Sequence, residues 1–219
     1  MTDAGHGHIQ DRLRAALRLP PPRPLRSDRD LWPDGDGDSC PAPGRLRRAA
    51  VLIPIRWVDR DTGFVILTKR AADLPHHGGQ VAFPGGSLEP GEEPVAAALR
   101  EAEEEIGLDP SAVRVEGLLE PYHTVTDFLV APVVGFVEGQ VTLRPNPAEV
   151  ATVFEVPLRR ILDIRAYRRA EGKRDGRRRR FFVLPHEEFF IWGATAHMLH
   201  GLAERWQRLA HGDATMTGS

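Results

Sequence analysis

The stretch that most constrains this chain is residues 86–108, GSLEPGEEPVAAALREAEEEIGL, in which a glycine-containing loop precedes a run rich in glutamate. Pro94 suits the first turn of a helix, where the missing N–H would have no intrahelical partner. Gly107 is typical of the residue that follows a helix, and Pro110 prevents the helix from resuming. The stretch therefore predicts a loop followed by a short helix that ends near residue 106.

The predicted helix has two faces of different chemistry. At ~100° per residue, one arc of about 100° holds Glu101, Glu104 and Glu105. A separate arc holds the apolar residues expected to pack on a core, which are Val95, Ala98, Leu99, Ala102 and Ile106. Carboxylates three or four residues apart repel one another, so this arrangement predicts a nearby counter-charge. A divalent cation such as Mg²⁺ or Mn²⁺ fits, because it prefers oxygen ligands and binds phosphate oxygens alongside carboxylates.

The spacing of these residues resembles the Nudix box, G-x5-E-x7-R-E-U-x-E-E-x-G-U, in which U is a bulky aliphatic residue. The matching residues are Gly86, Glu92, Arg100, Glu101, Ala102, Glu104, Glu105, Gly107 and Leu108. Every fixed position is matched, and the one departure is Ala102, which is apolar but small. The resemblance implies that Glu101, Glu104 and Glu105 bind the metal. The alternative is an ordinary solvated acidic face, which the glycine and arginine framework disfavours.

Further catalytic candidates lie in and beyond the box. Arg100, together with Glu92, is expected to maintain geometry, because an arginine can hydrogen-bond a carboxylate and orient it for a metal. In other Nudix enzymes a downstream carboxylate completes the metal site or acts as the base. Glu149, at a predicted strand start, is our candidate for that role and Glu120 is a weaker one. The alternative for Glu149 is a solvated or structural glutamate.

Residues 67–86, LTKRAADLPHHGGQVAFPGG, form a second pattern upstream of the box. Its glycines allow a ligand to approach the backbone closely, although tight turns alone would also explain them. Arg70 offers a planar fork suited to a diphosphate oxygen, with a surface ion pair as the alternative. His77, whose alternative is a structural histidine, and Gln80 are polar groups beside this loop. The residues expected to bind substrate are Arg70, His77, Gln80, Gly85 and Gly86.

This second pattern resembles the signature of the coenzyme A pyrophosphatase branch of Nudix hydrolases, roughly L-T-x-R-[SA] followed by L-x-x-H-x-G-Q-V-x-F-P-G-G. Residues 145–150 and 191–196 also resemble that branch, so the likeness covers about residues 49–205. It implies an α/β/α sandwich with a mixed β-sheet. It also implies hydrolysis of coenzyme A, or of acyl or oxidised coenzyme A, to 4′-phosphopantetheine and adenosine 3′,5′-bisphosphate. The alternatives are another nucleoside diphosphate derivative, such as ADP-ribose or a dinucleotide, or a Nudix binding module without catalysis.

A basic cluster surrounds a predicted hairpin tip. It consists of Arg174, Arg177, Arg178, Arg179 and Arg180. A solvated turn is the simplest explanation of such a cluster. The functional alternative is attraction to a polyanionic ligand, such as the 3′-phosphate of coenzyme A. A nucleic-acid patch is disfavoured because no RNA-binding aromatic motif accompanies the arginines.

The chain divides into three predicted parts. Residues 1–45 form an N-terminal arm with a helix over 9–19 and a Pro/Gly-rich linker over 20–43, residues 46–211 form the Nudix domain, and residues 212–219 form a disordered tail. Strands are expected over 49–58, 64–68, 81–83, 113–119, 128–137 and 150–156, a short helix over 157–163, a hairpin of 164–169 with 179–184, and a helix over 192–210. Pro54 suggests a bulge or an edge within the first of these strands.

Composition limits the partners and the compartment. The net charge of −2 gives no overall attraction to nucleic acid or membrane, and no apolar run approaches the ~20 residues of a membrane span. The single cysteine, Cys40, precludes an internal disulfide and fits a reducing compartment. We therefore expect a cytoplasmic protein, monomeric or homodimeric, that acts on a small molecule.

Overall fold

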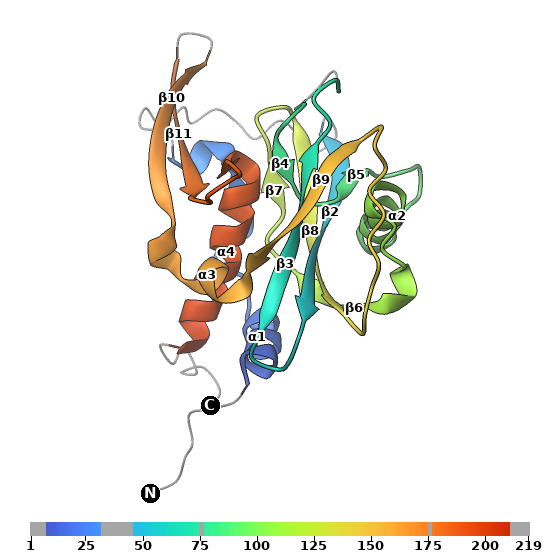
Figure 1. Ribbon diagram of the computed structural model, residues 1–219. Helices are drawn as coiled ribbons and strands as arrows, with labels where there is room; N and C mark the ends of the chain where they lie inside the picture. The colour runs from blue at the N-terminus through green and yellow to red at the C-terminus, as the bar shows by residue number, and fades with distance from the viewer. Residues whose placement is uncertain (1–7, 32–45, 75–76, 175–176, 211–219) are drawn as a thin grey trace, which may run out of the picture.

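The computed structural model describes residues 8–31, 46–74, 77–174 and 177–210. These residues form a layered domain in which a mixed β-sheet lies between helices (Figure 1). In chain order the elements are α1 (Ile9–Arg18), β1 (Arg26–Ser27), η1 (Asp28–Leu31), β2 (Arg47–Trp57), β3 (Gly63–Arg70), β4 (Val81–Ala82), β5 (Gly85–Ser87), α2 (Pro94–Ile106), η3 (Pro110–Ala112), β6 (Val113–Leu118), β7 (Tyr122–His123), β8 (Phe128–Val137), β9 (Val150–Pro157), α3 (Leu158–Leu162), η4 (Ile164–Ala166), β10 (Arg168–Arg174), β11 (Arg177–Leu184), β12 (Ile191–Trp192) and α4 (Gly193–Ala210).

The main sheet has nine strands and is organised around β2. Its strand order is β1-β7-β8-β2-β3-β4, with β5 also paired to β2, β6 to β8 and β9 to β3. The strand β2 runs parallel to β8 and antiparallel to β3, so the sheet is mixed. A second sheet of three strands, β10-β11-β12, stands beside α4 (Figure 1).

Both faces of the main sheet are buried, as the alternation along β2 shows. Ala50 and Leu52 belong to the core beneath α2, whereas Ile53 and Ile55 belong to the core on the opposite face. Alternate side chains of a strand point to opposite faces, so a strand between two helical layers is apolar on both. Figure 1 shows α2 on one side of the sheet and α1, α3 and α4 on the other. The predicted α/β/α sandwich is confirmed.

The helix α2 has the ends and the packing face that its sequence predicts. Pro94 occupies its first turn, and Gly107 ends it in the left-handed conformation with φ of 65°. The N–H groups of Gly107 and Leu108 donate hydrogen bonds to the carbonyls of Glu103 and Ala102, respectively. These bonds satisfy acceptors at the end of the helix. The small Ala102 is 1% exposed, so it packs fully against the sheet.

The N-terminal arm is more ordered than the linker predicted for residues 20–43. The predicted helix is present as α1, but β1 and η1 follow it where we expected irregular chain. β1 pairs in parallel with β7, with Arg26 opposite Tyr122. This pairing joins segments far apart in the sequence, so the local composition of the arm does not reveal it.

Two local expectations were wrong. Pro54 lies neither at an edge nor in a bulge but inside β2, opposite Gly135 of β8 and between the stretches of β2 that pair with β5 and with β3. A residue without an N–H is tolerated there, where the strand changes partners on one side. The first arm of the predicted hairpin begins at Arg168 rather than at 164, because the Asp163 carboxylate accepts a hydrogen bond from the N–H of Arg165 and starts η4 instead.

Some expectations fall on residues outside those described. These are the linker from residue 32 to 43 with Cys40, the turn at Asp175 and Gly176, and the tail 212–219. Among the described helices, none combines the length and the apolar character that crossing a membrane requires.

Candidate active site

Arg100 links the loop before α2 to the helix itself. Its Nε and Nη2 atoms donate to the two carboxylate oxygens of Glu92 at 2.9 and 3.0 Å. Its Nη1 atom donates to Glu101 at 2.9 Å and to Glu104 at 3.1 Å. Nη2 also donates to the carbonyl of Ser87 at 3.3 Å. The planar guanidinium thereby fixes these glutamates relative to one another and to the loop.

The box glutamates Glu101, Glu104 and Glu105 are together called the carboxylate group, and Glu105 is its buried member. It is 2% exposed and accepts hydrogen bonds from the N–H of Gly85 at 3.2 Å and from Arg70 Nη1 at 3.4 Å. Burial raises the pKa of Glu105 to about 7, and the charges of Glu101 and Glu149 add to this effect, while its two donors oppose it. Glu105 therefore changes charge close to neutral pH.

Glu101 and Glu149 belong to the same electrostatic group. Burial raises the pKa of Glu101, and the charges of Glu104 and Glu149 raise it further, against the lowering effect of Arg100. Glu149 directly precedes β9, and the side-chain amide of Asn146 donates to its Oε1 at 3.4 Å. The negative charge of Glu149 therefore acts on both Glu101 and Glu105.

The glycine of the box lies directly against a carboxylate. Gly86 is in β5, opposite Ala50 of β2. A Cβ at position 86 would lie 2.5 Å from the carboxyl atoms of Glu101, so any side chain there would displace that carboxylate. Only glycine lets the Glu101 carboxylate rest on this strand without displacement.

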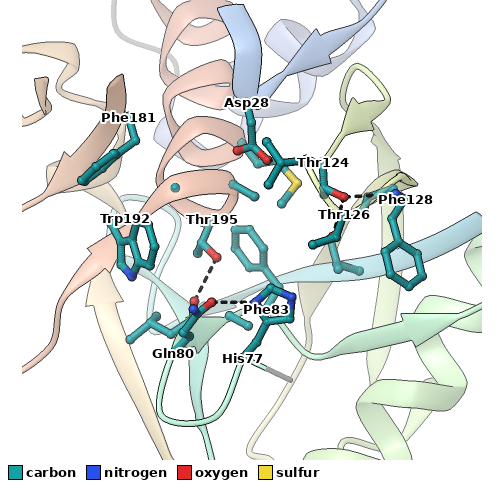
Figure 2. A pocket seen from close by; sticks show the side chains of 18 of the residues that line it. Asp28, His77, Gln80, Phe83, Thr124, Thr126, Phe128, Phe181, Trp192 and Thr195 are labelled. Carbon is teal, nitrogen blue, oxygen red and sulfur yellow. Dashed lines mark hydrogen bonds between the residues drawn. The ribbon is translucent and has the colours of Figure 1, made fainter. Parts of the chain in front are cut away.

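A pocket of about 800 Å³ adjoins Gly85 and Gly86 (Figure 2). The residues predicted to bind substrate all line it, namely Arg70, His77, Gln80, Gly85 and Gly86. The Nδ1 atom of His77 lies 3.0 Å from Gln80 Oε1, which orients both side chains. Gly85 contacts Glu105 and Gly86 contacts Glu101. These two glycines, called the glycine loop, therefore join the pocket to the carboxylate group.

One side of the pocket, the basic–aromatic wall, comes from β10, β11, β12 and the segment before β12. It consists of Lys173, Arg179, Arg180, Phe181, Phe190 and Trp192. The Trp192 ring meets the edge of Phe181 at 5.2 Å and stacks with Phe190 at 5.9 Å, although Phe190 is 60% exposed. Of the predicted basic cluster, Arg178 is exposed and does not line the pocket; the side chains of Arg174 and Arg177 lie outside those described.

The N-terminal arm and the loop after β7 supply another side of the pocket. Its lining residues there include Asp28, Thr124, Val125, Thr126 and Met198 of α4. Figure 2 shows Asp28 beside Thr124, across the pocket from Trp192. This side joins η1 to a loop almost a hundred residues later in the chain, so the pocket depends on long-range pairing.

A comparison with known protein families agrees with the box found in the sequence. A family model of the NUDIX domain matches residues 46–179. This chain belongs to the Nudix family. Nudix hydrolases act on small-molecule substrates and use divalent metal ions such as Mg²⁺ or Mn²⁺.

Curated relatives agree with this assignment. An uncharacterized Nudix hydrolase NudL of Photorhabdus laumondii is 39% identical over 195 residues, covering 89% of this chain and 95% of the relative. A relative of the same description from Salmonella paratyphi B is 44% identical over 158 residues, covering 72% of this chain and 81% of its own. Among solved structures, the Nudix hydrolase RenU of M. smegmatis is 22% identical with a TM-score of 0.45, covering 80% and 89% of the two chains.

The carboxylates of this Nudix site suit a hard divalent ion by chemistry. They offer only oxygen donors, and the raised pKa of Glu101 and of Glu105 shows that negative charge there is costly without a further cation. Among the described residues, however, no three histidine, cysteine, aspartate or glutamate side chains are already arranged to hold an ion. Arg100 and Arg70 occupy the carboxylate oxygens instead. In this conformation Arg100 and Arg70 supply part of the counter-charge that the glutamate spacing predicts.

Glu120, the weaker candidate for the downstream carboxylate, belongs to a different part of the Nudix domain. Its side chain is fully buried and accepts hydrogen bonds from Arg26 at 3.3 Å and Arg205 at 3.2 Å. It therefore joins the N-terminal arm to α4 and is not among the residues that line the pocket. Both of its carboxylate oxygens are thus used in an ion-pair network.

Several pocket residues were missed from sequence. The aromatic residues Phe181, Phe190 and Trp192 stand in two short apolar runs, 181–184 and 189–192, which buried strands would equally explain. The exposure of Phe190 is what separates a binding surface from a core, and only the structure supplies it. Asp28 carried no signal at all, because its place in the pocket depends on the pairing of β1 with β7.

Proposed function

We propose that this Nudix hydrolase cleaves the diphosphate bond of coenzyme A, giving 4′-phosphopantetheine and adenosine 3′,5′-bisphosphate. The observation that carries the proposal is that one pocket joins the glycine loop to the basic–aromatic wall. The glycine loop contacts the box carboxylates, and the wall offers positive charge beside aromatic rings, of which that of Phe190 is exposed. A diphosphate that bears an adenosine 3′-phosphate on one side requires both features.

The diphosphate is proposed to lie between Arg70 and the glycine loop. Arg70 already donates Nη1 to Glu105, and its buried Nε has no hydrogen-bond partner among the described residues. A buried donor without a partner is costly, and a phosphate oxygen would satisfy it. Arg70 would then hold the substrate against the carboxylate group and offset part of its charge.

Hydrolysis requires water to form a bond to one phosphorus while the bridging P–O bond breaks and the second phosphate leaves. Glu101, Glu104 and Glu105 would hold Mg²⁺ or Mn²⁺, which would supply charge stabilisation and make water more acidic. Arg100 fixes Glu101 and Glu104 in position for that role. Glu149, beside this group, is our proposed proton acceptor.

The basic–aromatic wall is proposed to bind the nucleotide end of the substrate. Trp192 and Phe190 offer ring faces on which an adenine can stack. Arg179 and Arg180 beside them suit the 3′-phosphate, because a guanidinium pairs with phosphate through two N–H groups. ADP-ribose and most dinucleotides lack this phosphate, so the wall favours coenzyme A over them. A binding module without catalysis is disfavoured because every box carboxylate is present.

The direct test is mass spectrometry of the products formed from coenzyme A in H₂¹⁸O with Mg²⁺ or Mn²⁺. We expect equal amounts of the two named products, with one ¹⁸O atom in only one of them, which identifies the phosphorus attacked. ADP-ribose and a dinucleotide serve as competing substrates in parallel reactions. Coenzyme A left intact while ADP-ribose is cleaved would refute the substrate and leave the family assignment standing.

A double substitution tests the basic–aromatic wall. Replacing Arg179 and Arg180 with Ser should raise KM for coenzyme A by about 10-fold, because it removes charge-assisted hydrogen bonds to the 3′-phosphate. The KM for dephospho-coenzyme A, which lacks that phosphate, should change much less. Arg178→Ser is the matched control, since Arg178 is on the same strand but outside the pocket. Equal changes in KM for both substrates would contradict the assignment of this wall.

A further inference from the structure

The N-terminal arm is fastened to the domain by buried charges. Arg26 of β1 is 1% exposed and donates to Glu120 at 3.3 Å and also to Glu204 of α4. Arg205 donates to Glu120 and to the carbonyl of Leu17 at 3.2 Å each. Breaking such pairs would leave buried charge uncompensated, so η1 is held in a fixed place beside the pocket.

Asp28, the first residue of η1, is oriented by two donors. Its Oδ1 accepts from the Tyr122 hydroxyl at 2.8 Å and its Oδ2 accepts from the N–H of Val125 at 2.9 Å. His197 Nδ1 lies 3.1 Å from the same hydroxyl oxygen, and burial lowers the pKa of His197 to about 3. Because the single hydroxyl proton goes to Asp28, the neutral His197 donates from Nδ1 to Tyr122. The carboxylate thus has a defined orientation at the pocket surface.

Asp28 is also the one acidic side chain among the described residues that line the pocket. The other charged side chains there are basic, namely Arg70, Lys173, Arg179 and Arg180. The residues that line the pocket on the same side as Asp28, which include Thr124, Val125 and Thr126, are uncharged. The pocket therefore has a positive side for anions and a separate side that accepts hydrogen bonds and repels anions.

Burial makes an additional donor valuable to Asp28. Desolvation raises the pKa of this carboxyl, although its hydrogen bonds to Val125 and Tyr122 and the charge of His123 oppose the effect. Each carboxylate oxygen can accept more than one hydrogen bond, so both can still accept from a ligand. A ligand N–H is favoured at such a group, and a ligand carboxylate is disfavoured.

We propose that Asp28 is a specificity-determining residue, which accepts a hydrogen bond from the neutral end of the substrate and excludes substrates whose far end is anionic. This inference rests on the proposed function, because the pantetheine arm of coenzyme A is neutral and carries amide N–H groups. The basic–aromatic wall holds the nucleotide, and the arm of the substrate extends to Asp28, Thr124 and Thr126. Asp28 then discriminates between neutral and anionic acyl groups on the thiol.

The test compares hydrolysis of free coenzyme A, butyryl-coenzyme A and succinyl-coenzyme A by the wild type and by Asp28→Asn. We expect the wild type to favour the butyryl over the succinyl thioester by about 10-fold or more in kcat/KM, because like charges brought together are strongly disfavoured. In Asp28→Asn the preference should fall to about 2-fold or less, with free coenzyme A still cleaved. Asp30→Asn, which removes an acidic group of η1 that does not line the pocket, should keep the wild-type preference.

A second variant separates charge from support of the loop. Tyr122→Phe removes the hydroxyl that orients Asp28 and leaves the carboxylate in place, so the preference should persist. A wild type that cleaves both thioesters equally would overturn the inference, whether or not Asp28→Asn folds. Loss of the preference in Tyr122→Phe to the same extent as in Asp28→Asn would also overturn it. Failure to cleave coenzyme A at all would instead refute the proposed function together with this inference.

Discussion

Replacing Glu105 by Gln should lower kcat by about 10²-fold or more, since charge stabilisation by metal-binding groups is usually the largest contribution to such reactions. Gln keeps the size of the side chain and an oxygen that can accept from Gly85, but it removes the negative charge that would hold a divalent ion. Because Glu105 contacts both Gly85 and Arg70, its loss affects the metal side and the diphosphate side of the site together. The measurement is steady-state hydrolysis of coenzyme A at saturating Mg²⁺.

The control for this substitution lies on the same helix. Glu103 is exposed and occupies a variable position of the box, so Glu103→Gln should retain nearly full activity. Glu104→Gln should behave like Glu105→Gln, because Arg100 holds Glu104 in the same group. Near-normal turnover in both box variants would remove the metal assignment.

Glu105→Gln should also stabilise the metal-free protein at alkaline pH. Burial raises the pKa of Glu105 from 4.5 to about 7, so ionisation of the folded protein costs free energy that the unfolded chain does not incur. Below pH 4.5 the carboxyl is protonated in both states and imposes no cost. The difference in Tm between variant and wild type, measured in EDTA, should therefore grow as the pH rises from 4.5 through 7. A difference independent of pH would show that Glu105 ionises normally.

Arg100→Lys should lower kcat by about 10- to 100-fold, the usual cost of losing a group that orients metal ligands. A lysine keeps the positive charge but is a point donor, so it cannot bond Glu92 through two atoms while also reaching Glu101 and Glu104. The glutamates would then lose their fixed spacing. The metal concentration needed for half-maximal activity should rise with the loss of kcat.

A matched substitution distinguishes this role from a general effect of removing an arginine. Arg114 also forms ion pairs, with Glu116 and Glu138, but at 49% side-chain exposure on the surface of β6. Exposed pairs contribute little, so Arg114→Lys should leave activity and stability nearly unchanged. If Arg100→Lys behaves in the same way, the orienting role of Arg100 is wrong.

Local signals account for the parts of the fold that were predicted well. Pro94 and Gly107 define the ends of α2 without help from the rest of the chain. A continuous apolar run predicts β2, because its odd and even residues each face a core. The box spacing places Arg100 beside Glu104 on the helix, and the contact between them needs only one helical turn.

The parts that were missed depend on partners distant in sequence. Asp28 lines the pocket because β1 pairs with β7 and because Arg26 finds Glu120 and Glu204. The local sequence around Asp28 does not indicate those partners. The hydrogen bond from Arg100 to a box glutamate was expected from the sequence, but the one from Arg70 to Glu105 was not, since it depends on side-chain placement in three dimensions.

The lining of the pocket extends along the chain from Asp28 to Met198. A growing polypeptide emerges at about 5–20 residues per second, and its early segments can pair before its late ones exist. While α4 is still missing, Arg26 and Glu120 lack Glu204 and Arg205, and the pocket lacks Thr195 and Met198. A nascent chain whose α4 has not yet emerged from the ribosome therefore lacks part of the pocket lining.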